Sequence, residues 1–380
     1  MLLPNGKILA GSLITNQTYL YDIATNSWSY AASKVYPDRS DEESWVKLVN
    51  GKVLTYDIFE SIGQPGQYAE IYDPATRTWS SISPSDGSAQ GTIPVLSSNA
   101  LGAELGPLLR VRGHGIQGQI FGIGATGHTA LYSPSTNTWS PGPDVRGTLG
   151  TTSALFGADD APAVVMPNGH VLFAADAGPT LGTFSAPTQL FDFDPVANTI
   201  SPVSPSIPDT VLNSVPAFIT RMLVLPNGQI LFSDSTRQLW VYTPDGAPDP
   251  SSLPVMSNTR YSGRGVFTLQ GVRMNGPSAG SSYGDDVESD ENYPIVRLED
   301  ATGHVYYART SNWSKTGIGQ SVSDETVDFT LKPGMAPGDY SVIVSGAGVS
   351  SRPRCITITS GQIGGTASGS NNAITCAGKP

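Results

Sequence analysis

The sequence predicts an all-β protein in which one small antiparallel unit recurs. A phrase that reads Leu-Pro-Asn-Gly-Lys-Ile-Leu in its fullest form occurs at residues 3–9, 49–54, 166–172 and 225–231. Asn-Gly between alternating apolar residues predicts a hairpin with a two-residue turn and positive φ at both turn positions. The chain also holds 42 Gly and 30 Pro among 380 residues, and no stretch combines a helical period with capping residues. Repeated hairpins and abundant turn residues together favour many short strands.

A second phrase follows each hairpin and carries an aromatic residue before a turn and, in most copies, a tryptophan after it. The turn is built on Asp-Pro or Ser-Pro in several copies. We expect these aromatic side chains to have a structural role and to pack between adjacent units. The aromatic positions are Tyr21, Tyr72, Tyr132, Phe193 and Tyr242.

In this pattern the chain resembles Kelch repeats, which implies a β-propeller over residues 1–256. Five blades are visible, at residues 1–35, 40–85, 100–143, 155–205 and 215–255. Since residue 1 already lies inside a repeat, we expect that upstream sequence is missing. A sixth blade or a closing strand is therefore an alternative to five blades.

From residue 257 the period disappears and a different alternation begins. Alternating segments at 267–271, 295–298, 304–309, 327–331 and 340–344 predict an immunoglobulin-like β-sandwich over 257–360. The Gly- and Ser-rich residues 361–380 predict a flexible tail. Residues 283–286, 292–298 and 305–314 resemble the C-terminal domain of galactose oxidase and glyoxal oxidase, which are secreted Kelch propellers. In those oxidases a loop of this domain supplies a copper-binding histidine at the propeller axis.

The copper ligands that this resemblance implies are absent from the sequence. The family uses two histidines, two tyrosines and a cysteine cross-linked to one tyrosine. None of His114, His128, His170 and His304 follows a tyrosine, and residues 310–313 read Thr-Ser-Asn-Trp where the loop histidine is expected. Both cysteines lie after the propeller, where one disulfide is plausible. Copper needs imidazole or thiolate ligands that converge. We therefore expect the scaffold without copper-radical oxidase activity.

The charge balance limits the partners. A formal net charge of -11 and a pI near 4.7 disfavour nucleic acid and anionic membranes. No apolar run approaches the roughly 18 residues of a membrane span. Few lysines and the sequons at Asn16 and Asn312 favour a secreted, extracellular protein, although the chain has no signal peptide. The oligomeric state stays open.

The repeat register places carboxylates where the first strand of a unit begins. The position nine residues before the turn glycine is Glu42, Glu104 or Asp160 in three successive units. Further carboxylates flank these residues or end the second strands, which face the same side. We call this side, where the first strands begin around the central channel, the mouth of the propeller. Arg39 and Arg221 are the expected cations there, and the loop around His128 is able to reach it. The flanking and strand-end carboxylates are Glu43, Asp57, Asp159, Asp176 and Asp234.

Converging carboxylates repel one another, so their retention predicts a metal ion, another bound cation, or acid–base work with separated pKa values. In one hypothesis Glu42, Glu104 and Asp160 supply the catalytic carboxylates of a glycoside hydrolase. In another the mouth holds Ca²⁺ and binds a carbohydrate, a small polar ligand or a protein without catalysis. A solvated acidic rim is the third interpretation. A further acidic loop, which is either solvated or a Ca²⁺ site, holds Asp285, Asp286, Glu288, Asp290 and Glu291.

Overall fold

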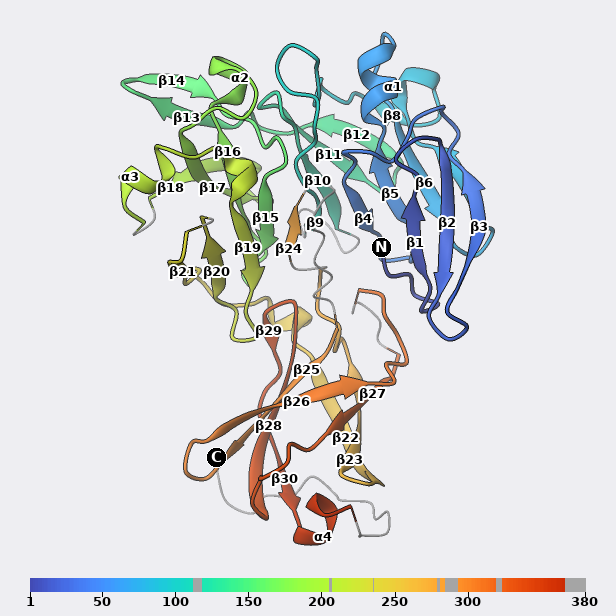
Figure 1. Cartoon of the computed structure of the whole chain (residues 1–380), viewed down its shortest axis with the longest axis vertical. Coiled ribbons are helices and arrows are strands. Elements are labelled where there is room, and N and C mark those ends of the chain that lie inside the picture. The colour runs from blue at the N-terminus through green and yellow to red at the C-terminus, as the bar shows by residue number, and fades with distance from the viewer. Residues whose placement is uncertain are drawn as a thin grey trace.

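A computed structural model describes residues 1–111, 118–204, 207–234, 236–278, 281–283, 293–318 and 323–365. Within these residues the protein is all-β, and its helices are short. An upper group of small sheets is built from residues 1–242, and the C-terminal residues form a separate unit below it (Figure 1). No helix in the described ranges is long and apolar enough to cross a membrane.

Five repeated sheets follow one another along residues 8–242, each built on antiparallel strands that are consecutive in sequence (Figure 1). These strands fall within the five expected repeat ranges, except for a two-residue strand of the third sheet at residues 90–91. The fourth sheet also gains one strand from the C-terminal unit. The first holds β1 (Ile8–Gly11), β2 (Gln17–Asp22) and β3 (Ser27–Ser33), and the second β4 (Trp45–Lys47), β5 (Val53–Tyr56), β6 (Ala69–Asp73) and β7 (Thr78–Ser81). The third holds β9 (Leu108–Val111), β10 (Gln119–Ile123), β11 (Thr129–Ser133) and β12 (Thr138–Pro141), with β8 (Gln90–Gly91) parallel to β12. The fourth holds β15 (Pro162–Val165), β16 (Val171–Asp176), β17 (Thr188–Asp194) and β18 (Thr199–Val203), and the fifth β19 (Arg221–Val224), β20 (Ile230–Ser233) and β21 (Leu239–Tyr242).

Elements that the repeat pattern did not predict decorate these sheets. They are the hairpin β13 (Arg146–Leu149) and β14 (Thr152–Leu155) and the helices α1 (Ile58–Gly63), α2 (Gly178–Leu181) and α3 (Asp209–Leu212). Single 3-10 turns lie at Pro84–Asp86, Ala217–Ile219 and Pro250–Ser252. In Figure 1, α1, α2 and the hairpin lie at the end of the sheets away from the C-terminal unit.

The repeated hairpin turn differs from the expected two-residue turn. Gly6 has φ of 77°, but Asn5 is not among the positive-φ residues. The Gly6 amide donates to the Leu3 carbonyl at 2.9 Å, and the Leu3 amide donates to the Lys7 carbonyl at 2.8 Å. The loop therefore has three residues, with a type I turn and then a glycine in the left-handed region. Proline at the second turn position favours this geometry because its φ is already set. The same two hydrogen bonds recur in the copies that contain Gly51, Gly169 and Gly228.

The first strands of successive sheets lie side by side, β4 by β9, β9 by β15 and β15 by β19. The repeated aromatic residues tie neighbouring sheets together, as expected. The Trp79 indole donates to Thr18 Oγ1 of the first sheet at 3.0 Å, and the Trp139 indole to the Ile82 carbonyl at 2.8 Å. Phe121 stacks on Phe193 of the next sheet, with ring centroids 3.9 Å apart.

The C-terminal unit is one continuous antiparallel path around its own core, with β26 as the connecting strand. Residues 305–308 of β26 pair with β25, and residues 309–311 pair with β27. A strand that changes partner in this way turns a corner between two packed layers. The buried side chains between them include Phe267, Leu298 and Tyr340. The strands are β22 (Val255–Gly263), β23 (Val266–Val272), β25 (Ile295–Asp300), β26 (Val305–Ser311), β27 (Glu325–Thr330), β28 (Gly338–Gly346), β29 (Val349–Ser350) and β30 (Arg354–Ile358).

One strand of this unit leaves it and joins the fourth sheet. Strand β24 (Ser281–Tyr283) pairs antiparallel with β15, with Tyr283 opposite Pro162 (Figure 1). The C-terminal chain therefore reaches the first strands of the repeated sheets. Cys355 is in a disulfide, and the other cysteine, Cys376, lies outside the described residues.

The first residues of the expected tail belong to the C-terminal unit. Residues Ser360–Ile363 form α4, which has a capping box between Thr359 and Gln362. Gln362 is 3% exposed, and its carbonyl accepts a hydrogen bond from the Tyr261 hydroxyl at 3.3 Å. Residues 366–380, the rest of the expected tail, lie outside the described residues.

Candidate functional site

The structure brings Glu42, Glu104 and Asp160 together. One carboxylate oxygen from each residue lies within 4.8 Å of the other two. Glu42 and Glu104 are half-buried, whereas Asp160 is buried at 6% exposure. Each residue precedes the first strand of its sheet, so adjacent first strands deliver the three side chains to one place. We call these three residues the mouth group.

The backbone holds two members of the mouth group in the same uncommon conformation. Glu42 has φ of 62° and Asp160 has φ of 49°, both in the left-handed region. Residues other than glycine enter this region at a cost, and they stay there when their surroundings fix them. The two residues hold equivalent positions in their repeats, whereas Glu104, the third member of the group, is not among the positive-φ residues.

Two further carboxylates lie beside the mouth group. Asp159 is 2% exposed, and no donor in the described residues makes a well-formed hydrogen bond to either of its oxygens. Burial, with the negative charges of Glu104, Asp176 and Glu42, raises the pKa of Asp159 to about 8, although the Glu104 amide lowers it. Burial also raises the pKa of Asp176 to about 6, against hydrogen bonds from the amides of Ala217 and Gly178. At neutral pH Asp159 therefore carries a proton next to the mouth group.

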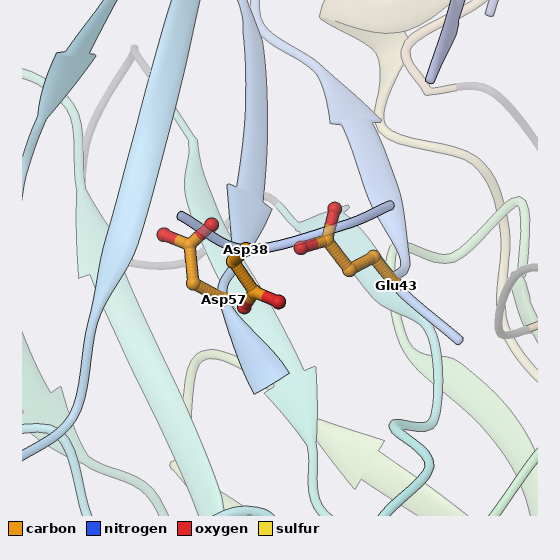
Figure 2. A group of neighbouring side chains, drawn as sticks. All are labelled: Asp38, Glu43 and Asp57. Carbon is orange, nitrogen blue, oxygen red and sulfur yellow. The ribbon is translucent and has the colours of Figure 1, made fainter. Parts of the chain in front are cut away.

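Glu43 and Asp57, expected at the same mouth, belong instead to a second cluster with Asp38. Carboxylate oxygens of these three residues also lie within 4.8 Å of one another (Figure 2). The Lys34 ammonium contacts Glu43 and lies 2.6 Å from Asp57 Oδ1, and all three of these side chains are fully buried. We call Lys34, Asp38, Glu43 and Asp57 the lysine cluster.

The electrostatics of the lysine cluster reflect burial and charge pairing together. Burial alone would lower the pKa of Lys34, but the negative charges of Glu43, Asp57 and Asp38 raise it above its usual range. Burial raises the pKa of Glu43 well above its ordinary value, against the attraction of Lys34. It raises the pKa of Asp57 to about 6 and also raises that of Asp38.

The remaining expected site residues contact their own neighbours. Arg39 Nε lies 2.8 Å from Asp41, and its guanidinium lies 3.6 Å from the centre of the Phe59 ring. His128 Nδ1 lies 2.8 Å from Asp144. Arg221 donates to the carbonyls of Phe218 and Thr220, and Asp234 accepts from Thr236 and Trp240. His114 and the acidic loop from Asp285 to Glu291 lie outside the described residues.

Sequence reasoning missed Lys34 and Asp38. Lys34 follows the last strand of the first sheet, and Asp38 lies in the connection to the second sheet, so no repeat register identifies them. Glu70 was also missed. It is fully buried and accepts hydrogen bonds from the amides of Val35 and Tyr36 at 2.7 and 2.9 Å. The one feature of the sequence that could have pointed to this cluster is a lysine in a connection between sheets, in a chain with few lysines.

The donor set of both clusters is carboxylate oxygen alone. Across the part of the chain that the structure describes, no group of metal-ligand residues includes a histidine or a cysteine. Carboxylate oxygens suit hard cations such as Ca²⁺, whereas copper prefers nitrogen and sulfur ligands. The mouth group therefore fits a hard divalent cation in its chemistry.

A large open groove lies elsewhere, between the repeated sheets and the C-terminal unit. Its volume is about 780 Å³, and its lining includes Asn227, Tyr293, Tyr307 and Trp313. It belongs to the side where the Asn-Gly turns meet the C-terminal unit, as the Ser350 hydroxyl donates to the Pro226 carbonyl at 3.0 Å. The mouth group lies at the opposite ends of the first strands. The groove and the carboxylate cluster are therefore separate sites.

Comparison with known proteins gives distant structural likenesses. No family model matches the chain, and no curated protein matches it. A fungal alcohol oxidase of the AA5 family in complex with copper is similar at 14% identity and a TM-score of 0.37, over 94% of this chain and 84% of that one. PorZ, a surface component of the type-IX secretion system of Porphyromonas gingivalis, is similar at 13% identity and a TM-score of 0.41, over 93% of this chain and 44% of PorZ. The extracellular domain of a hybrid two-component system of B. thetaiotaomicron is similar at 13% identity and a TM-score of 0.35, over 90% of this chain and 42% of that one. Likenesses at these levels do not identify a family.

Proposed function

We propose that this chain is a secreted binding protein that holds a hard divalent cation, with Ca²⁺ as the best fit, in the mouth group. The repeated sheets are taken as blades of a Kelch-type propeller and the C-terminal unit as its immunoglobulin-like partner. The cation then recognises the hydroxyl groups of a carbohydrate or another small polar ligand at the mouth.

The observation that carries this proposal is the mutual distance of the three carboxylates. Protein oxygens bind Ca²⁺ at 2.3–2.6 Å, so two ligands of one ion lie at most about 5 Å apart. One oxygen each of Glu42, Glu104 and Asp160 meets this limit, with mutual distances within 4.8 Å. Asp159 also supports the proposal: burial raises its pKa, the negative charges of Glu104, Asp176 and Glu42 raise it further, and a bound cation would offset these charges.

Calcium titration of the intact chain tests the proposal. We expect one Ca²⁺ per chain by isothermal titration calorimetry after treatment with a chelator. Glu42→Gln or Asp160→Asn should weaken binding about 10- to 100-fold, since ligand charge sets calcium affinity. Asp41→Asn is the matched control, because Asp41 lies in the same loop and pairs with Arg39. No binding by the wild-type chain, or equal loss in Asp41→Asn, would refute the calcium site.

A second candidate is glycoside hydrolysis by the same residues, favoured by the proton that Asp159 holds. Retaining glycosidases place two carboxyl groups about 5–5.5 Å apart, one of them protonated. In this alternative two of Glu42, Glu104 and Asp160 act on the glycosidic bond, one as the acid that protonates the leaving oxygen and the other as base or nucleophile. Release of reducing sugar from a glycan panel, abolished by Glu104→Gln, would favour hydrolysis over binding alone.

A further inference from the structure

In the lysine cluster three carboxylates are grouped as they would be around a bound metal ion, but the positive charge among them is the ammonium group of Lys34. Asp38, Glu43 and Asp57 direct their carboxylates into one region, with Glu43 opposite Asp57 (Figure 2). The ammonium of Lys34 contacts Glu43 and lies 2.6 Å from Asp57 Oδ1. Since these side chains are fully shielded from solvent, Lys34 neutralises charge that a bound metal ion would otherwise have to neutralise.

This cluster fixes both ends of the loop that carries Glu42. At one end, Asp38 Oδ2 accepts the amides of Phe59 and Glu60 at 3.0 and 3.2 Å, at the start of α1. At the other end, Glu43 contacts Lys34 and accepts hydrogen bonds from Trp45 and Thr55. Only four residues separate these two anchors.

Glu42 lies between the anchors and needs such support. Its φ of 62° is costly for a residue with a side chain, and its neighbour Glu43 is the residue that Lys34 holds. The two adjacent side chains separate, since Glu43 enters the lysine cluster and Glu42 enters the mouth group. The direction of Glu42 therefore depends on the attachment of Glu43.

We propose that Lys34 is a positioning residue for the calcium site, a built-in cation that anchors Glu43 and so holds Glu42 toward Glu104 and Asp160. The inference rests on the proposed calcium site. Lys34 contacts the ligand-bearing loop and not the ion, as a residue of an outer coordination layer does. Loss of such support usually costs 10- to 100-fold in metal affinity.

The test compares calcium affinity with stability in Lys34→Met, Glu43→Gln and Glu325→Gln, each in the full chain. Glu325→Gln is the matched control, because Glu325 is as buried as Glu43 and accepts the Met274 amide, but lies in β27 of the C-terminal unit. We expect Lys34→Met to lower both the melting temperature and the calcium affinity, the latter about tenfold or more. Glu325→Gln should lower the melting temperature and leave the affinity within twofold.

The outcomes of this test separate failure of the calcium site from failure of the positioning role of Lys34. If wild type does not bind Ca²⁺, the proposed calcium site fails. If wild type binds and Lys34→Met and Glu43→Gln, titrated below their melting temperatures, keep its affinity, the positioning role fails alone. Glu43→Gln retains Lys34 and keeps the test decisive should Lys34→Met not fold. A second bound Ca²⁺ in Lys34→Met, retained in Lys34→Met/Asp160→Asn, would support Lys34 as the stand-in for a metal ion.

Discussion

At the scale of single residues, the mouth combines buried carboxyl groups that differ in how they are satisfied. Asp176 accepts backbone amides with both oxygens, whereas Asp159 lacks a well-formed hydrogen bond from the described residues. Hydrogen bonds from amides favour the charged form, and burial disfavours it. This difference, together with the negative charges of Glu104, Asp176 and Glu42 around Asp159, accounts for its higher pKa, about 8 compared with about 6 for Asp176. Asp159 and Asp176 therefore differ in protonation at pH 7.

We predict that the free energy of unfolding falls as the pH rises from about 5 to about 8 in the presence of a chelator. The pKa of Asp159 is about 8 in the folded chain against 3.8 for the free side chain, so the folded state binds more protons between these values. The stabilisation is complete only below the unfolded-state pKa of 3.8 and is lost as the pH rises toward 8. Between pH 5 and pH 8 its loss is of the order of a few kcal/mol. Chemical denaturation across this range measures the slope.

Asp159→Asn should reduce this slope, since asparagine does not titrate, and the remaining slope would come from other buried carboxyl groups such as Glu70, whose pKa burial raises to about 8. Asp22→Asn is the control, because its hydrogen bond to Lys7 lowers the pKa of Asp22 and moves its titration below the measured range. A slope unchanged in Asp159→Asn would show that other groups cause it.

At the scale of elements, glycine allows the strands of the mouth to approach closely. A Cβ on Gly157 would lie 1.9 Å from the Ala125 carbonyl oxygen. Gly157 also exchanges two backbone hydrogen bonds of 2.9 Å with Asp176. The segment that leads to Asp159 and Asp160 is therefore held against the third sheet by main-chain contact.

We predict that Gly157→Ala destabilises the fold by about 1–3 kcal/mol, because a backbone contact this close forces the segment to move. The same displacement should weaken calcium binding severalfold through Asp160. Gly63→Ala is the control, since its Cβ would meet nothing within 4 Å. Thermal denaturation and calcium titration together check the prediction, and unchanged affinity in a destabilised Gly157→Ala would contradict it.

The repeat register explains how much of this molecule the sequence predicts. Periodic positions repeat their geometry, so counting nine residues back from a turn glycine found Glu42, Glu104 and Asp160, which lie together. The same register did not distinguish Glu43, which enters the lysine cluster, from Asp159, which lies beside the mouth group, although each is next in sequence to a member of that group. The turn type was also wrong, since the Asn-Gly signal outweighed the preceding proline.

Features set by contacts between sheets were beyond sequence reasoning. Lys34 meets Glu43 only because the first sheet ends beside the loop that enters the second. Likewise, β24 pairs with β15 across more than a hundred residues of chain. Neither contact leaves a period or a motif in the sequence.

At the scale of the whole molecule, the C-terminal unit is attached to the repeated sheets at several separate places. Strand β24 extends the fourth sheet, and Arg110 of the third sheet donates to the Pro277 carbonyl. The Thr316 hydroxyl donates to the Leu3 carbonyl at 2.6 Å, beside the first hairpin turn. These contacts distribute the attachment over the first, third and fourth sheets.

We predict that the whole chain unfolds in a single calorimetric transition and that Ca²⁺ shifts this entire transition to a higher temperature. Since β24 completes the fourth sheet, loss of the C-terminal unit would leave β15 without a partner on one side, and loss of the sheets would expose β24. Calcium at 100 times its dissociation constant should add about 2.7 kcal/mol to the folded state. Because the proposed calcium site lies in the repeated sheets alone, a shift of the entire heat-absorption peak would show that the C-terminal unit shares the stabilisation. Two separate peaks, of which calcium moves one, would show instead that the units unfold independently.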